Sequence, residues 1–167
     1  MTFHPVAKKI TGLLSQNHCW YETFEHDPVR TSEEAAKIRH NYSLHQGAKA
    51  LILRIKKTET ERKFIMLVIP GDLRFDSHKV KKIFNVKDIR FATKEEIGKL
   101  TDGVQIGGVP PFGNLFDLEV VVDPEIFENE KIIFNAGDQR FSVAMKSQDF
   151  KNLVKPQIVK ITSEVFP

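Results

Sequence analysis

The chain has 167 residues, of which 41% are hydrophobic and 28% are charged. This length and apolar content suit a single sizeable core, so we expect residues 1–167 to form one domain. The net charge of +3 is mildly basic, which allows a polyanionic partner without requiring one. The single cysteine, Cys19, excludes an intramolecular disulfide and a cysteine zinc cluster.

The N-terminal residues and the hydropathy of the chain bear on its location. Residues 1–9 lack the order of basic and then apolar residues that a signal peptide has. No apolar run approaches the roughly 18 residues that a membrane-spanning helix needs. Together with the lone cysteine, this predicts a cytoplasmic protein that does not contact a membrane.

The first 40 residues alternate between helical and strand patterns. Apolar residues at helical spacing predict a helix over about 6–14, entered through Pro5. Residues 19–26 alternate loosely and predict a strand. Thr31, with a glutamate three residues later, has the signature of a capping box and predicts a short helix ending near Arg39.

The middle of the chain predicts the centre of a sheet. Two apolar, branched runs at 48–56 and 63–70 are separated by polar residues, which indicates an antiparallel hairpin. Further elements follow on the same reasoning: a helix to Phe84 capped by Asp76 or Ser77, a strand at 89–91, and a helix to Leu100 capped by Thr93.

The last third of the chain is rich in strands. Residues 118–122 predict a buried strand, and residues 131–134 and 140–146 predict two more around a turn at 135–138. Ser147 is expected to cap a helix ending near residue 154, and residues 159–162 suit an edge strand or a tail. The order of elements predicts an α/β or α+β domain with a mixed sheet.

A glycine and proline segment, GGVPPFG at 107–113, cannot form a helix or a central strand. Its prolines fix φ and remove N–H groups, while its glycines can adopt positive φ and let a ligand approach the backbone closely. We therefore expect a rigid loop with backbone amides free for a ligand. The simpler alternative is a tight connection between two elements.

Several kinds of chemistry are absent from the sequence. All six histidines lie within the first 78 residues, no HxxxH or HxH pair occurs, and no carboxylates are spaced for a metal site. The sequence has no GxSxG, GxxxxGK[ST] or GxGxxG motif, which argues against a serine-hydrolase elbow, a nucleoside triphosphatase and a dinucleotide enzyme. We expect neither a metal nor a cofactor.

The loop at 107–113, downstream of GAKAL at 47–51, resembles the YbaK-type aminoacyl-tRNA deacylases. That family includes the free-standing Cys-tRNA(Pro) deacylase, the ProX-type trans-editing proteins and the editing domain inserted in bacterial prolyl-tRNA synthetases. The resemblance extends to residues 26–36, 68–76 and 135–137. It implies a mixed, curved and partly barrel-like sheet flanked by helices.

The resemblance implies a metal-independent trans-editing hydrolase that deacylates a mischarged aminoacyl-tRNA, with mischarged tRNA(Pro) as the expected substrate. Two catalytic residues follow from it. Lys49 interrupts an apolar strand and would engage the terminal adenosine and position the ester; the alternative is a lysine that snorkels to the strand edge. Gly107 would begin the family's GxxxP motif, whose backbone orients the carbonyl or the attacking water. One such oxyanion donor is worth about 3 kcal/mol.

The remaining substrate-binding candidates come from the same motifs. Thr31 and Ser32 also have a simpler role as helix caps, and Asn135 to Asp138 suits an ordinary turn. Some relatives carry a histidine in this late region, which this sequence lacks, so contacts that depend on it are not expected here. The candidates are His26, Arg30, Thr31, Ser32, Gly108, Val109, Pro111, Phe112, Gly113, Asn135, Gly137 and Asp138.

The expected partner is aminoacyl-tRNA, bound through phosphate contacts and its 3′ end, with an aminoacyl-tRNA synthetase as a second partner and no DNA. Two alternatives stay open: a non-catalytic module of the same fold that binds an aminoacyl or nucleotide end, and a hydrolase of another small ester or amide. The sequence does not decide between cysteine, alanine, serine and threonine as the amino acid removed. The tRNA and the oligomeric state are equally open.

Overall fold

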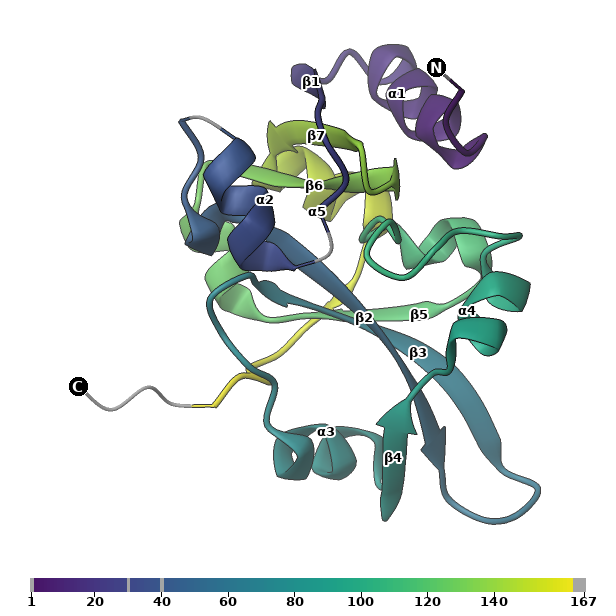
Figure 1. The fold of residues 1–167 in the computed structure, drawn as a ribbon. Coiled ribbons are helices and arrows are strands. Elements are labelled where there is room, and N and C mark those ends of the chain that lie inside the picture. The colour runs from purple at the N-terminus through teal and green to yellow at the C-terminus, as the bar shows by residue number, and fades with distance from the viewer. Residues whose placement is uncertain (1, 30, 40, 164–167) are drawn as a thin grey trace.

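The computed structural model describes residues 2–29, 31–39 and 41–163 (Figure 1). In this part of the chain, no helix is long and apolar enough to cross a membrane. The elements in chain order are α1 (Val6–Gln16), β1 (Tyr21–Glu25), α2 (Ser32–Ile38), η1 (Leu44–Gln46), β2 (Ala48–Lys56), β3 (Arg62–Pro70), α3 (Ser77–Phe84), β4 (Asp88–Phe91), α4 (Lys94–Leu100), η2 (Gly113–Phe116), β5 (Glu119–Val122), η3 (Pro124–Glu128), β6 (Lys131–Asp138), β7 (Phe141–Lys146), α5 (Ser147–Val154) and β8 (Gln157–Ile158).

The strands form two sheets, and the predicted hairpin lies at the centre of the larger one. The five-stranded sheet has the order β4-β2-β3-β5-β8, and the three-stranded sheet has the order β1-β7-β6. Strands β2 and β3 are antiparallel, whereas β5 pairs with β3 in parallel, so the larger sheet is mixed as expected. The sheets are not closed into a barrel: among the described residues, the only backbone pairing between the two sheets is a bridge between Gly47 and Ile133.

The larger sheet is covered on both faces, which explains why residues 65–70 of β3 are all buried. One face packs against the three-stranded sheet, α1 and α5. The other face packs against α3 through Val80 and against Ile161 near the C-terminal end. Figure 1 shows the hairpin running between these two layers.

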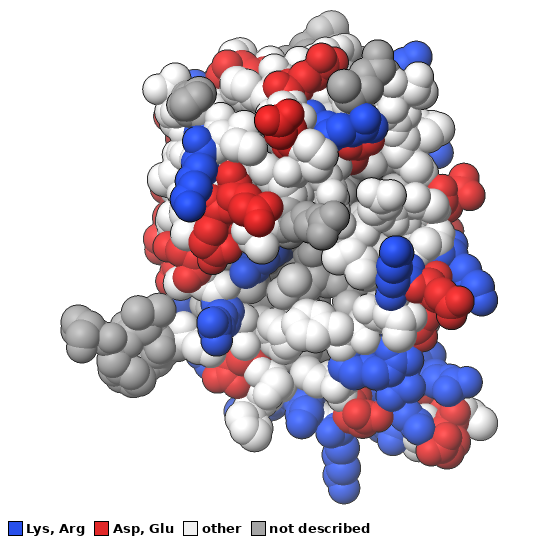
Figure 2. Space-filling view, in the orientation of Figure 1, with Lys and Arg blue, Asp and Glu red and all other residues white. Residues whose placement is uncertain are grey.

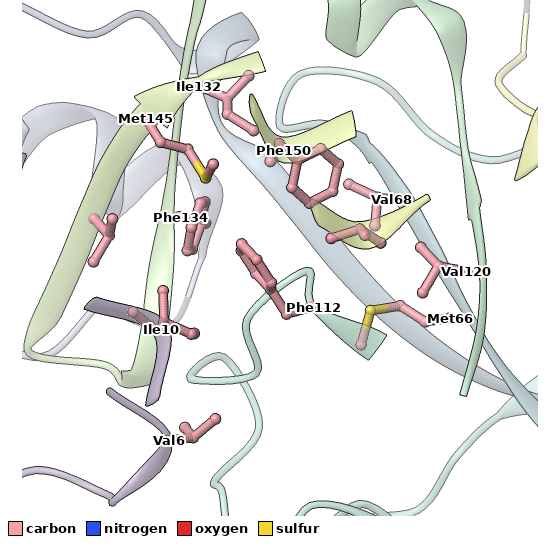
Figure 3. Close-up of a cluster of buried hydrophobic side chains, with 14 of the residues drawn as sticks. Val6, Ile10, Met66, Val68, Phe112, Val120, Ile132, Phe134, Met145 and Phe150 are labelled. Atoms are coloured by element: carbon pink, nitrogen blue, oxygen red, sulfur yellow. The ribbon is translucent and has the colours of Figure 1, made fainter. Parts of the chain in front are cut away.

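Phe112 lies at the centre of the first core (Figure 3). Its ring centroid is 5.7 Å from that of Phe134 on β6 and 5.6 Å from that of Phe150 on α5. Met66 and Val120 of the larger sheet belong to the same cluster. Phe112 therefore anchors the glycine and proline loop between the two sheets.

Three predicted caps are confirmed and one is wrong. The side chains of Thr31, Asp76 and Thr93 accept hydrogen bonds from backbone N–H groups at the starts of α2, α3 and α4. Ser147 does not cap α5, because its hydroxyl donates instead to the carbonyl oxygen of Asn129 at 2.5 Å.

The predicted turn at 135–138 is also wrong. Strand β6 continues to Asp138 and contains a bulge between Asn135 and Asp138, with Gly137 at a φ of 101°. The turn follows at residues 139–140. A bulge of this kind redirects side chains and backbone groups, and here it faces the glycine and proline loop.

Candidate active site

A cavity of about 470 Å³ lies between α2, the first half of β2 and the loop at 106–109. Its walls combine apolar side chains with a few polar groups, as is usual for a ligand site. The polar side chains that line it include Thr31, Ser32, Arg39, Lys49 and Asn135. Thr31 and Ser32 lie at the start of α2, and Arg39 directly follows its last residue. Lys49 lies on β2 and Asn135 on β6.

Strand β6 holds the loop in place through two hydrogen bonds to loop carbonyls. The side-chain amide of Asn135 donates to the carbonyl oxygen of Gly107 at 2.7 Å. The backbone N–H of Gly137 donates to the carbonyl oxygen of Gly108 at 2.7 Å. Both donors lie in the bulge, so the irregularity in β6 is what allows them to reach the loop. Gly107 has a φ of 88°, a conformation that side chains rarely adopt.

The loop leaves two backbone N–H groups at the cavity without an acceptor. Within the described residues, the N–H groups of Gly107 and Val109 make no hydrogen bond, and both residues line the cavity. The N–H of Gly108 differs, because it donates to the carbonyl oxygen of Gln105 at 2.9 Å. Two free donors beside a cavity can polarise a carbonyl oxygen or bind an anion.

Lys49 lies in the cavity wall and is half-buried. Its ammonium group donates to the carbonyl oxygen of Leu73 at 3.2 Å. Burial lowers the pKa of Lys49; nearby Glu33 and Asp72 oppose this shift, and Arg74 adds to it. An ammonium group has three donors, and one such bond leaves the others available for a ligand.

Arg39 is a second cation in the wall, and it was not among the site residues predicted from the sequence. It is 7% exposed, its Nε donates to the hydroxyl of Ser142 at 3.0 Å, and its Nη2 donates to Oδ1 of Asn135 at 2.7 Å. Burial lowers the pKa of Arg39 to about 10. Arg39 makes no ion pair with any residue that the structure describes. The buried guanidinium is held by neutral partners and contributes positive charge to the cavity, whose lining also includes the carboxylate of Glu33.

His26 completes this polar network from behind the wall. Its Nδ1 lies 2.8 Å from the carbonyl oxygen of Asp27, which can only accept, so Nδ1 carries the hydrogen. Its Nε2 lies 2.7 Å from the hydroxyl oxygen of Ser142, and that hydroxyl donates its hydrogen to Oδ1 of Asn135 at 3.1 Å. Ser142 is fully buried and does not line the cavity, so this serine and histidine pair positions Arg39 and Asn135 and does not supply a nucleophile.

The other candidates from the sequence divide into two groups. Thr31, Ser32, Val109 and Asn135 line the cavity with Lys49 and Gly107. Arg30 lies outside the described residues. The rest lie behind the wall and support the loop: Gly108, Pro111, Phe112 and Gly113 are buried, Gly137 packs against Val6, and Asp138 forms an ion pair with Arg140 at 2.7 Å.

A polar cluster outside the cavity brings together possible metal ligands that the sequence spacing did not reveal. His45, Glu125 and Glu128 have donor atoms within 4.8 Å of one another. Nδ1 of His45 lies 2.8 Å from Oδ1 of Asp72, and the ammonium of Lys160 donates to Glu125 at 3.0 Å. A lysine bound to one of the carboxylates opposes a second cation, so ion pairing accounts for this cluster.

The fold and the cavity define a class: an α+β domain whose site offers a half-buried lysine, two free loop amides and a buried guanidinium to one ligand. Residues 26–153 match the family model described as the aminoacyl-tRNA editing domain. The chain therefore belongs to the aminoacyl-tRNA editing domain family.

Similar proteins agree with this assignment. The chain is 29% identical over 153 residues to the multifunctional Ser/Thr-tRNA deacylase ProXp-y of Escherichia coli K12, covering 91% of this chain and 90% of that protein. It is 28% identical to the prolyl-tRNA editing protein ProX of Acetoanaerobium sticklandii, covering 81% of this chain and 82% of that protein. A crystal structure of a candidate trans-editing enzyme for prolyl-tRNA synthetase shares the fold, with a TM-score of 0.79, 23% identity, and coverage of 98% of this chain and 100% of that chain.

Proposed function

We propose that the protein hydrolyses the ester bond of a mischarged aminoacyl-tRNA in trans, without a metal ion. The observation that carries the proposal is that Lys49 and the free N–H groups of Gly107 and Val109 line one cavity. An aminoacyl ester is an activated substrate, so positioning and electrostatic stabilisation can supply the catalysis without a protein nucleophile.

In the proposed reaction, the loop amides bind the ester carbonyl while a water molecule attacks its carbon. The water oxygen bonds to that carbon, the bond from the carbon to the ribose oxygen breaks, and a proton from the water ends on the ribose hydroxyl. The N–H groups of Gly107 and Val109 stabilise the negative charge that develops on the carbonyl oxygen. Lys49 binds the terminal ribose or phosphate and so fixes the ester against the loop.

We propose a small polar amino acid as the acyl group, with serine and threonine ahead of alanine and cysteine. The cavity offers the hydroxyls of Thr31 and Ser32 and the amide of Asn135, which can hydrogen-bond to a side-chain hydroxyl. The similarity to a Ser/Thr-tRNA deacylase over most of both chains supports the same choice. We propose tRNA(Pro) as the carrier, which the similarity to a prolyl-tRNA editing protein supports.

The partners and location follow from this reaction. We propose that residues 1–167 act as one editing domain in the cytoplasm, where charged tRNA is used, and that a synthetase that releases mischarged tRNA is a second partner. Contacts to the tRNA backbone would come from basic side chains that remain free. Some are already in ion pairs with acidic side chains: Arg54 with Asp88, Lys56 with Glu59, and Lys63 with Glu119.

The test is release of the amino acid by the purified protein, with EDTA present, from tRNAs charged with serine, threonine, alanine, cysteine or proline. Faster release of serine or threonine than of proline from tRNA(Pro) is the expected result. Free aminoacyl ethyl esters run in parallel separate a tRNA-directed deacylase from a general esterase. Binding of charged tRNA without release of any amino acid would favour the non-catalytic module instead.

A further inference from the structure

Two large apolar side chains at the mouth of the cavity are left exposed. Phe91 is 58% exposed and Ile106 is 50% exposed, and both line the cavity. A contiguous exposed apolar patch that adjoins polar groups is typical of a ligand-binding groove. Ile106 directly precedes Gly107, so this surface adjoins the loop that is proposed to bind the ester.

Phe91 is supported by the pairing of its backbone and by one aromatic neighbour. Phe91 ends the edge strand β4, where its backbone pairs with Leu53 of β2. Its carbonyl oxygen accepts a hydrogen bond from Arg90 at 3.0 Å. The ring of Phe75 meets it edge to face, with centroids 5.6 Å apart and an angle of 84°. The ring is thus supported by a second aromatic ring while most of its surface faces solvent.

Positive charge occurs in the chain segment that contains Phe75, and Arg74 acts electrostatically on Lys49. Arg74 directly precedes Phe75, and Lys49 donates to the carbonyl oxygen of Leu73 in the same segment. The guanidinium of Arg74 forms no ion pair with any of the residues described. Figure 2 shows further Lys and Arg side chains, mixed with acidic ones, over α3, β4 and the end of the hairpin. A flat apolar surface with cations beside it is the chemistry that binds a nucleotide.

We propose that Phe91 is the stacking surface for the 3′-terminal base of the tRNA, with Arg74 beside it to contact a phosphate. The identity of the tRNA in this arrangement rests on the proposed function, whereas nucleotide binding itself does not. With the ester carbonyl at the loop and the base on Phe91, the terminal ribose lies between them, beside Lys49. Stacking tolerates any base, and it suffices here because every tRNA ends in the same CCA sequence.

The binding test uses the trinucleotide CpCpA and the full-length protein, followed by calorimetry or by chemical shifts in NMR spectra. Phe91→Ala is expected to weaken binding by roughly 5- to 150-fold, and Phe91→Trp is expected to retain it. Trp20→Ala is the matched control, because Trp20 is an exposed aromatic residue that does not line the cavity. Equal binding of CpCpA by wild type and Phe91→Ala, or no binding by wild type, would overturn the proposal.

A kinetic readout separates stacking from a structural role of the ring. Phe91→Ala is expected to lower kcat/KM on seryl-tRNA more than on serine ethyl ester, which has no base. An equal loss on both substrates would indicate a disturbed cavity and would overturn the proposal, as would a dimer of the wild type that Phe91→Ala dissociates. A wild type that hydrolyses no charged tRNA and yet binds CpCpA more tightly than Phe91→Ala does is a separate outcome. In that case the proposed deacylase activity fails and the proposed nucleotide site stands.

Discussion

Lys49 and Arg39 bring two positive charges to one cavity, and their donors are used differently. Two of the five N–H donors of Arg39 bind Ser142 and Asn135, and Asn135 in turn donates to the carbonyl oxygen of Gly107. The ammonium of Lys49 contacts the protein only through the carbonyl of Leu73 among the residues described. We therefore expect Arg39 to position the loop through Asn135, and we propose Lys49 as the residue that contacts the substrate.

Arg39→Lys keeps the charge but removes the fork that binds both partners. We expect kcat/KM for deacylation to fall by roughly 10- to 100-fold, since a lost charge-assisted hydrogen bond costs about 1.5–3 kcal/mol. Steady-state kinetics of Arg39→Lys, Asn135→Ala and the double variant measure this. Because both act through the same loop, the double variant should lose little more than either single variant. Fully additive losses would contradict the assignment.

Replacing Lys49 by an apolar residue is expected to raise stability and to lower activity. Since folding lowers the pKa of Lys49 by burial, the folded protein holds the proton less tightly than the unfolded chain, and the charged lysine costs stability at neutral pH. Lys49→Met should therefore raise the midpoint of thermal unfolding at pH 7 while impairing deacylation. The gain should shrink as the pH rises through the folded pKa, below the ordinary value for lysine. A variant less stable than wild type at pH 7 would contradict this account.

At the scale of elements, the bulge in β6 matters most, because it is the support for the loop. Gly137 sits in the bulge at a φ of 101°, and a Cβ added there would collide with Cγ1 of Val6. Its N–H is also the donor to Gly108. The conformation of one residue thus links α1, β6 and the loop.

Gly137→Ala is expected to lower the free energy of unfolding by about 1–3 kcal/mol, the usual cost of a strained backbone position. It should also lower deacylation activity, because a displaced bulge moves the loop. The matched control is Gly98→Ala in α4, where no atom lies within 4 Å of the added Cβ. That control should stabilise the protein by about 0.5–1 kcal/mol. Chemical denaturation measures the free energy of unfolding of both variants. A Gly137→Ala protein with the stability and activity of wild type would refute the role of the bulge.

Local patterns in the sequence predicted the elements well but missed their irregularities. The hairpin of β2 and β3 and the caps at Thr31, Asp76 and Thr93 followed from adjacent residues. The bulge at 135–138 did not, because Asn-Ala-Gly-Asp reads as a turn unless its partners in the loop, about 30 residues away, are known. Arg39 was missed for the same reason, since Ser142 and Asn135 lie about 100 residues further along. Lys49 could be found because it interrupts an apolar strand.

In the whole molecule, Asp123 connects the segment around Ile161 and Thr162 to the larger sheet through hydrogen bonds. Its fully buried carboxylate accepts hydrogen bonds from the N–H groups of Ile161 and Thr162, both at 3.0 Å, and of Glu125 at 2.9 Å. Burial of the carboxyl opposes its ionisation, but these bonds outweigh burial and lower the pKa of Asp123. This segment covers the face of the sheet opposite the three-stranded sheet.

Asp123→Asn replaces a carboxylate oxygen, which accepts hydrogen bonds, by an NH₂ group, which can only donate. That NH₂ group would face backbone N–H groups, which are also donors. We expect a loss of about 1–3 kcal/mol in the free energy of unfolding at pH 7. Because the folded pKa is lowered, the contribution of the carboxylate is present above the unfolded pKa of about 3.9 and is lost as the pH falls through the folded value. The difference between wild type and variant should therefore narrow in acid. A difference that stays constant between pH 7 and pH 3 would count against this account.

The role of Lys49 in hydrolysis is tested by single-turnover release of labelled serine from seryl-tRNA(Pro) by wild type and Lys49→Ala, with EDTA present. We expect release by wild type well above the rate in buffer. For Lys49→Ala we expect a rate at least about 100-fold lower, on the order of 3 kcal/mol of lost transition-state stabilisation, with an unchanged circular dichroism spectrum. Equal rates from wild type and a folded Lys49→Ala would show that the lysine in the cavity wall does not take part in hydrolysis.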